Sequence, residues 1–216
     1  MQTRVTQKTF HMTTLRFPDD LPPTSTYDAV LFDFDGTLVD TTPNHCRAWN
    51  TAVRELTGLA CELSVRDFNF KFAGKSSEQV ANYFAARTGS DPAQLLIAAR
   101  AMKKSFTDGW HEIKQVVDFA FNVSGAGAKV AIVSNGDLEG IFHVINHTHL
   151  CEIPSLVIVG SGDEMLFRAK PAPDGFLTAA VTLKTDPSCC IVIEDSPIGL
   201  EAAARAGMRA YQVIHS

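Results

Sequence analysis

Residues 29–37 read Ala-Val-Leu-Phe-Asp-Phe-Asp-Gly-Thr, a short apolar run that leads directly into two aspartates, a glycine and a threonine. A continuous apolar run of this length, bounded by turn residues, is typical of a strand that is buried on both faces of a parallel sheet. The stretch therefore predicts a central strand over 29–32 with acidic side chains at its carboxyl end.

The same pattern recurs along the chain and predicts further strands of one sheet. Apolar runs that end in polar or turn residues occupy 130–133, 156–159, 191–193 and, more weakly, 210–214. Segments with helical periodicity lie between these runs, at 137–148, 173–183 and 196–206. Strands that alternate with helices build βαβ units. We therefore expect an α/β fold with a doubly wound, Rossmann-like parallel sheet.

One connection is too long for this alternation. Nearly a hundred residues separate the first predicted strand from the second, and helical patterns fill them at 43–57, 76–87, 92–107 and 111–122. Because a loop of that length needs structure of its own, we expect residues 44–112 to form an inserted α-helical cap. The catalytic core would then comprise 27–43 and 113–216, and residues 1–26 would be a flexible leader.

Composition and charge exclude several classes of protein. The longest stretch without a charged residue has 12 residues, whereas a bilayer span needs about 20 apolar ones, so we expect no membrane protein. The net charge is −5 and no basic stripe is visible, which disfavours nucleic acid as a partner. The five cysteines are odd in number and form no Cys-x-x-Cys pair, a usage that favours reduced thiols and a cytoplasmic location.

Polar side chains gather where the predicted strands end, and ligands of open α/β sheets bind at that edge. These residues are Asp33, Asp35, Ser134, Lys170, Glu194 and Asp195. Clustered carboxylates repel one another unless a cation or a lysine compensates them. Oxygen ligands without paired histidine or cysteine favour Mg²⁺, which binds one or two carboxylates together with substrate phosphate. We therefore expect a Mg²⁺-assisted phosphate site at this edge.

The segment Asp33-Phe34-Asp35-Gly36-Thr37-Leu38-Val39-Asp40, followed in order by Ser134, Lys170 and Glu194-Asp195, resembles the motif set of the haloacid dehalogenase (HAD) superfamily of aspartate-nucleophile phosphohydrolases. The resemblance covers about residues 27–214. The helical insertion directly after the first motif is similar to the subfamily that includes β-phosphoglucomutase, phosphoglycolate phosphatase and many sugar-phosphate phosphatases.

The resemblance implies a role for each motif residue. Asp33 would be the nucleophile, and Asp35 the general acid and base. Ser134 would hydrogen-bond a phosphoryl oxygen, and Lys170 would neutralise Asp33 and the transferring group. The metal ligands would be Asp33, Asp35 (through its backbone carbonyl), Asp195 and Glu194, the last as a ligand or as a neighbour of the ligands. The expected phosphate-binding residues are Gly36, Thr37, Asn135 and Gly136, near a helix N-terminus.

Two further residues are candidates for substrate recognition. Lys75 lies in a predicted turn of the cap, 72–77, which faces the active site in this family, although an exposed lysine at a helix start is an equal alternative. His45, with Trp49 four residues later, resembles the hinge between cap and core in β-phosphoglucomutase-like proteins, with simple packing as the alternative. His143 and its neighbours His147 and His149 are expected to face solvent.

The function predicted from the sequence is a Mg²⁺-dependent phosphatase for a small phosphorylated metabolite, a sugar phosphate or a phosphoglycolate-like acid, acting as a monomer or homodimer. A sugar phosphomutase and a non-catalytic phosphometabolite-binding protein are the alternatives. The cap turn lacks the flanking lysine and arginine with which a mutase holds its bisphosphate. The presence of Asp35 argues against a dehalogenase, whose substrate has no phosphate oxygen to protonate.

Overall fold

The computed structural model describes residues 13–15, 23, 26–59, 62–72, 75–106, 108–160 and 168–214. Its main feature is a six-stranded sheet in the order β1-β8-β7-β2-β5-β6. The strands are β1 (Thr13–Leu15), β2 (Ala29–Phe32), β5 (Lys129–Ser134), β6 (Val157–Gly160), β7 (Cys190–Glu194) and β8 (Arg209–Val213). Every pairing in this sheet is parallel. The predicted α/β fold with a doubly wound parallel sheet is therefore confirmed.

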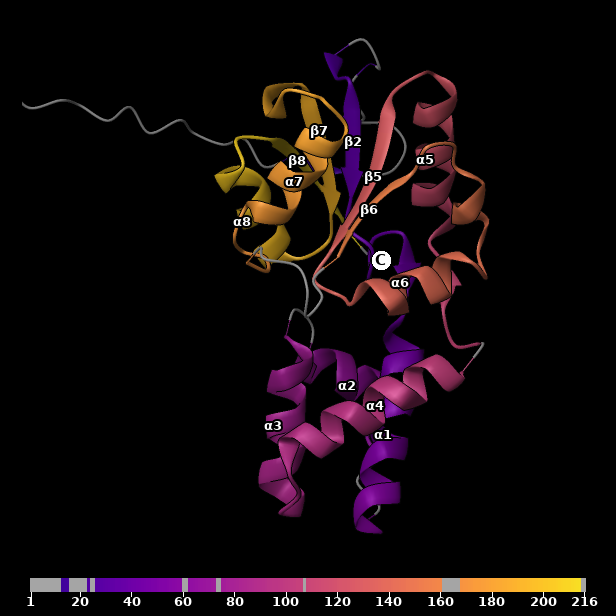
Figure 1. Ribbon diagram of the computed structural model, residues 1–216, viewed down its shortest axis with the longest axis vertical. Coiled ribbons are helices and arrows are strands. Elements are labelled where there is room, and N and C mark those ends of the chain that lie inside the picture. Colours follow the sequence, from indigo (N-terminus) through magenta and orange to yellow (C-terminus); the bar gives the residue numbers. More distant parts are fainter. Residues whose placement is uncertain are drawn as a thin grey trace, which may run out of the picture.

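The central strand β2 shows why the sheet is covered on both sides. Its four residues are fully buried, and their side chains alternate between two apolar layers. Val30 and Phe32 pack toward α5 (Lys114–Gly125) and α6 (Leu138–Ile145). Ala29 and Leu31 pack toward α7 (Asp174–Thr182) and α8 (Pro197–Arg205). The two helical layers flank the sheet in Figure 1.

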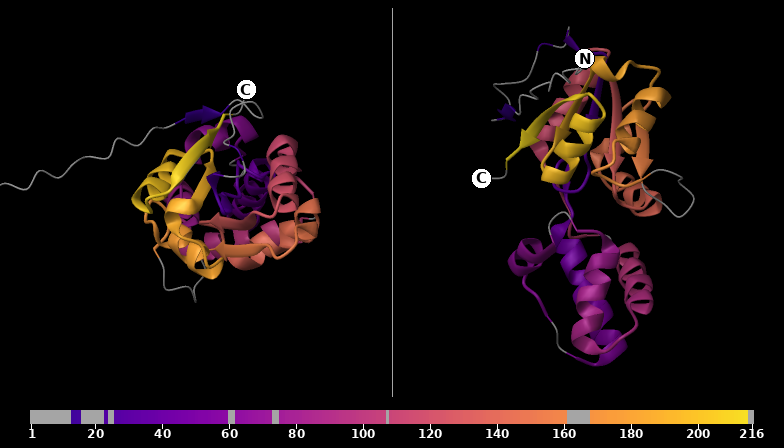
Figure 2. Two further views of the ribbon diagram at one scale, coloured as in Figure 1. Left: turned by 90° about the horizontal axis from the view of Figure 1, so that it is seen from above. Right: turned by 90° about the vertical axis from the view of Figure 1, so that its left-hand side faces the viewer.

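The insertion forms a separate helical unit below the sheet (Figures 1 and 2). Its helices are α1 (Thr42–Thr57), α2 (Val65–Phe72), α3 (Ser77–Thr88) and α4 (Pro92–Ser105), so its first helix starts two residues before the predicted boundary at 44. Apolar side chains of the four helices share a core of their own, in which the rings of Trp49 and Phe84 stack at 5.8 Å. The sequence patterns did not predict α2, which buries Phe68 and Phe72, four residues apart on one face.

The chain enters and leaves the cap along a pair of short strands. β3 (Val39–Asp40) and β4 (His111–Glu112) pair in antiparallel fashion, Val39 opposite Glu112. The sequence predicts a helix over 111–122, but its first residues form β4, and α5 begins at Lys114. The returning chain lies beside the entering one, and backbone pairing there replaces the first helical turn. These two strands are the connection seen between cap and core in Figure 2.

The structure also differs from the sequence expectation at the edge of the sheet. β1 lies within the segment 1–26, for which the sequence predicts a flexible leader, and it pairs with β8 through Thr13 opposite Tyr211 and Leu15 opposite Val213. β1 has only three residues, which are too few for a sequence pattern to predict a strand, and its pairing with β8 becomes visible only in the folded structure. Within the described ranges, no helix combines the length and the apolar character needed to cross a bilayer.

Candidate active site

The adjacent strands β7, β2 and β5 bring the predicted site residues to one edge of the sheet. Asp33 follows the last residue of β2, Ser134 is the last residue of β5, and Glu194 is the last residue of β7. All three side chains are buried. The parallel register is the reason, because it aligns the carboxyl ends of neighbouring strands.

Lys170 links the acids of this edge. Its ammonium lies 2.5 Å from Asp33 Oδ1 and 2.8 Å from Glu194 Oε2, and its side chain is almost fully buried. Burial by itself lowers the pKa of Lys170, but the charges of the two carboxylates outweigh it and raise the pKa above its ordinary value. The lysine is therefore a permanent cation beside the predicted nucleophile.

Asn135 anchors the backbone of Lys170. Its Oδ1 accepts a hydrogen bond from the Lys170 N–H at 2.8 Å, and its Nδ2 donates to the Lys170 carbonyl at 3.3 Å. The sequence predicts Asn135 as a phosphate-binding residue, and the structure gives its side chain this positioning contact. Gly136, predicted for the same role, donates its N–H to Ser134 Oγ at 2.9 Å. Both residues lie at the same edge of the sheet, in the turn between β5 and α6.

Glu194 is held on both oxygens. Oε1 accepts hydrogen bonds from Ser196 N and Ser196 Oγ, at 3.0 and 2.7 Å, and Oε2 accepts from Lys170. The space for this carboxylate exists because residue 199 is glycine: a Cβ atom there would lie 1.9 Å from Glu194 Oε2. The sequence patterns did not predict Ser196 or Gly199 as site residues. Ser196 is explained by its position as an ordinary helix N-cap, and the need for glycine at 199 is visible only in the folded structure.

Oxygen atoms of Asp33, Glu194 and Asp195 all lie within 4.8 Å of one another. This all-oxygen donor set suits a hard divalent cation. Two other predicted residues contact Asp195: Thr37 Oγ1 donates to its Oδ1 at 3.1 Å, and Gly36 (φ 90°) leaves no room for a Cβ, which would lie 2.6 Å from Asp195 Oδ2. The residues present therefore fit a Mg²⁺ ion.

The pKa of Asp33 shows the need for positive charge at this edge. Burial raises it well above its ordinary value, the charge of Glu194 raises it further, and Lys170 only partly opposes both. A cation held by the same carboxylates would stabilise the ionised form of Asp33.

The second aspartate of the motif, Asp35, has a different set of neighbours. Thr41 Oγ1 donates to Asp35 Oδ1 at 2.5 Å, Ser134 Oγ donates to Oδ2 at 3.3 Å, and His45 Nε2 lies 3.9 Å from Oδ1. Thr41 occupies the N-cap of α1, but its side chain makes no cap hydrogen bond because its hydroxyl serves Asp35. The sequence did not reveal this contact, since threonine before a helix is already explained by capping.

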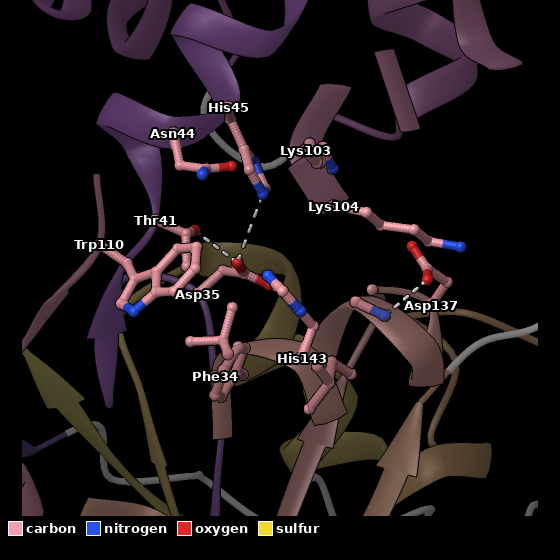
Figure 3. A pocket seen from close by; sticks show the side chains of 14 residues that line it. Phe34, Asp35, Thr41, Asn44, His45, Lys103, Lys104, Trp110, Asp137 and His143 are labelled. Atoms are coloured by element: carbon pink, nitrogen blue, oxygen red, sulfur yellow. Dashed lines mark hydrogen bonds and ion pairs between the residues drawn. The ribbon is translucent and has the colours of Figure 1, made fainter. Parts of the chain in front are cut away.

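A pocket opens beside Asp35, between the cap and the core (Figure 3). Its charged or titratable lining residues are Asp35, His45, Lys103, Lys104, Asp137 and His143. Lys103 and Lys104 come from the end of α4, and the sequence did not single them out because basic residues at a helix C-terminus are explained by the helix dipole. The predicted Lys75 is exposed at the start of α3, and is not among the lining residues.

Two histidines contribute to this pocket. Burial lowers the pKa of His45 to about 4, the charge of Lys103 lowers it as well, and Asp35 opposes this, so the ring is neutral at pH 7. The expectation that His143 faces solvent is wrong: it is half-buried and lines the pocket, with the Trp110 ring centroid 5.6 Å from its own. Because the cap lies next to α6, this surface of the helix becomes a wall of the pocket.

Comparisons with known proteins agree with this geometry. Residues 27–207 match the family model of haloacid dehalogenase-like hydrolases. The chain is similar to hexitol phosphatase A of Escherichia coli (strain K12), with 30% identity over 82% of this chain and 78% of that protein. It is also similar to the fructose-1-phosphate phosphatase YqaB of the same organism, with 27% identity over 87% of this chain and 96% of that one.

A solved structure supports the fold. A mutant of CbbY from Rhodobacter sphaeroides in complex with xylulose 1,5-bisphosphate superimposes with a TM-score of 0.74 at 22% identity, over 88% of this chain and 87% of that one. The chain belongs to the haloacid dehalogenase-like hydrolase family. The predicted family and enzyme class, a phosphoric monoester hydrolase of the HAD type, are thereby confirmed.

Proposed function

We propose that this protein is a Mg²⁺-dependent phosphatase that hydrolyses a small phosphorylated metabolite, a sugar phosphate or a phosphoglycolate-like acid, through an aspartyl-phosphate on Asp33. The observation that carries the proposal is the arrangement around Asp33. The carboxylate is buried against Lys170, while Asp35 comes from the same loop and lines a pocket that could receive the leaving group. The names of the two similar E. coli phosphatases support the same class of substrate.

In the first step Asp33 attacks the phosphorus atom, and the bond between phosphorus and the ester oxygen breaks. The Asp35 carboxyl group gives its proton to the departing oxygen. In the second step Asp35, now ionised, takes a proton from a water molecule, which attacks the aspartyl-phosphate. Inorganic phosphate leaves and the Asp33 carboxylate is restored. Thr41 keeps the Asp35 carboxyl group in place through its hydrogen bond to Oδ1.

Positive charge is supplied by the chain and by the cation. Lys170 partly offsets the effects of burial and of Glu194 on Asp33, and its ammonium would also face the charge of the transferring group. Asp33, Asp195, Glu194 and the backbone carbonyl of Asp35 would hold Mg²⁺. When bound, Mg²⁺ neutralises the charge between the carboxylate nucleophile and the phosphate, which otherwise repel each other. The Ser134 hydroxyl donates its single proton to Asp35 in this structure, and it would turn that proton to a phosphoryl oxygen when substrate is bound.

A panel of phosphate esters, assayed with Mg²⁺ by release of inorganic phosphate, tests the proposal. The panel includes a hexitol phosphate, fructose 1-phosphate and phosphoglycolate, and the Asp33→Asn variant is the control because an amide is a very poor nucleophile. We expect at least one ester to be hydrolysed by the wild type and none by the variant. If no ester is hydrolysed faster by the wild type than by the variant, the proposal is wrong.

The sugar phosphomutase alternative has a distinct product. It predicts conversion of a hexose 1-phosphate into the 6-phosphate when the assay is primed with the bisphosphate, without net release of phosphate. The cytoplasmic location and the oligomeric state stay predictions from the sequence.

A further inference from the structure

The pocket beside Asp35 carries charges of both signs, contributed by the cap and by the core. Lys103 and Lys104 reach it from α4 of the cap, and Asp137 reaches it from the start of α6 in the core. Figure 3 shows the Asp137 carboxylate on the core side of the pocket, facing the cap lysines. A substrate that places its phosphate against Asp33 would direct its leaving group into this space, because the pocket is lined by the proton donor Asp35.

The charge of Lys104 is already compensated. Its ammonium forms an ion pair with Glu139, which lies two residues after Asp137 on α6. This pair joins the cap to the core at the side of the pocket, since Glu139 is not one of the lining residues. Lys104 therefore offers little net charge to a ligand.

Lys103 has no ion-pair partner among the described residues, and it lines the pocket together with Asp137. Burial lowers its pKa, while the charges of Asp35 and Asp137 act in the opposite direction. Asp35 and Asp137 are thus the two acids of the pocket lining that offset the remaining lysine, and of these only Asp137 has no part in the proposed proton transfer. The lysine charges around the pocket are therefore compensated by acids of the core: Glu139 for Lys104, and Asp35 with Asp137 for Lys103.

The Asp137 carboxylate cannot readily move out of the way of a ligand. It is the N-cap residue of α6, and its Oδ1 accepts a hydrogen bond from the Gly140 N–H at 2.8 Å. The cap interaction keeps a fixed negative charge at the pocket wall. Low dielectric in a partly closed pocket strengthens its repulsion of another anion.

We infer that Asp137 selects substrates whose leaving group is uncharged, such as the polyhydroxylated part of a sugar or alditol monophosphate, and that it rejects a leaving group with a second phosphate or a carboxylate. The inference rests on the proposed function and narrows its substrate class. Repulsion of the wrong ligand is a common means of specificity.

Fructose 1-phosphate and fructose 1,6-bisphosphate form a matched pair of substrates, because they differ only by the second phosphate. We would measure kcat/KM for both with wild type, Asp137→Asn, Glu139→Gln and Asp118→Asn. Asparagine keeps the N-cap interaction, so Asp137→Asn removes the charge alone. Glu139→Gln leaves Lys104 without its acid. Asp118→Asn is the control, because it removes an acid from a lysine pair on α5, which contributes no lining residue.

We expect the wild type to prefer the monophosphate, and the ratio of bisphosphate to monophosphate kcat/KM to rise at least about fivefold in Asp137→Asn and in Glu139→Gln. Asp118→Asn should leave the ratio unchanged. A wild-type preference for the bisphosphate, or a smaller rise in Asp137→Asn, would overturn the inference. So would an equal rise in Asp118→Asn, since the effect would then follow from net charge.

Binding separates this inference from the proposed function. The ratio of the two dissociation constants, measured by calorimetry in an Asp33→Asn background with Mg²⁺, tests charge selection without turnover. If neither ester is hydrolysed by the wild type but Asp137→Asn still shifts this ratio fivefold, the proposed function fails and the selectivity stands. If fructose 1-phosphate is hydrolysed and neither ratio shifts, the inference alone fails.

Discussion

Replacing Gly199 by alanine tests how the site holds Glu194. Gly199 lies in the first turn of α8, where a Cβ atom would stand 1.9 Å from Glu194 Oε2 and 2.0 Å from its carboxyl carbon. Carbon and oxygen atoms in contact are usually about 3.3 Å apart. Because Glu194 is fully buried, its carboxylate would have to leave a place that three hydrogen bonds define.

The cost follows from those hydrogen bonds. Displacing the Glu194 carboxylate weakens its contacts with Ser196 and Lys170, and a hydrogen bond to a charged group contributes about 1.5–3 kcal/mol. If two such contacts are lost, the penalty is about 3–6 kcal/mol. The higher helix propensity of alanine relative to glycine stabilises the folded state by about 1 kcal/mol and offsets part of this penalty. We therefore expect Gly199→Ala to lower the free energy of unfolding by about 2–5 kcal/mol.

Urea denaturation measures this change, and Gly125→Ala is the matched control. Gly125 is the last residue of α5, and no atom lies within 4 Å of a Cβ placed there, so its variant should be as stable as the wild type or slightly more stable. Gly199→Ala should also release phosphate more slowly, because Lys170 loses a partner. If Gly199→Ala unfolds at the same urea concentration as the wild type and keeps full activity, the tight fit around Glu194 is not real.

Other predictions concern the chemistry and the pocket. Asp35→Asn should reduce kcat/KM for every ester, most strongly for those with poor leaving groups; an equal loss for p-nitrophenyl phosphate and for sugar phosphates would argue against proton donation. Asp195→Asn should raise the Mg²⁺ concentration needed for half-maximal phosphate release, and full activity in the presence of a chelator would contradict the metal site. Lys103→Ala should change kcat/KM by different factors for different substrates, which corresponds to about 1–3 kcal/mol of transition-state free energy. The effect should exceed that of Lys75→Ala, because of these two lysines only Lys103 lines the pocket. A larger effect of Lys75→Ala would show that the cap turn contacts the substrate. His45 should titrate near pH 4 in the folded protein, below the ordinary histidine pKa of about 6.5. Protonation of His45 therefore favours the unfolded state, and the contribution of this residue to the free energy of unfolding falls as the pH drops from about 6.5 toward 4. An NMR titration midpoint above about pH 6 would refute this.

Local sequence patterns were sufficient to predict the sheet and its polar edge. The apolar run 29–32 and its three strong counterparts became the neighbouring strands β2, β5, β6 and β7, each within about one residue of its expected bounds. A buried parallel strand must be apolar throughout, and the residue after it must lie at the ligand-binding edge. For this reason Asp33, Ser134 and Glu194 could be placed together from the order of residues alone.

Tertiary structure alone decided what surrounds those residues. The Thr41 hydroxyl, the glycine at 199 and the lysines of α4 each have an ordinary local explanation, in capping or in the helix dipole, which conceals their contacts with the site. The pocket exists only because the antiparallel strands β3 and β4 set the cap over α6. A sequence pattern reports the periodicity of one element, whereas a pocket between two units depends on their relative placement, and that is fixed by contacts between residues far apart in the chain.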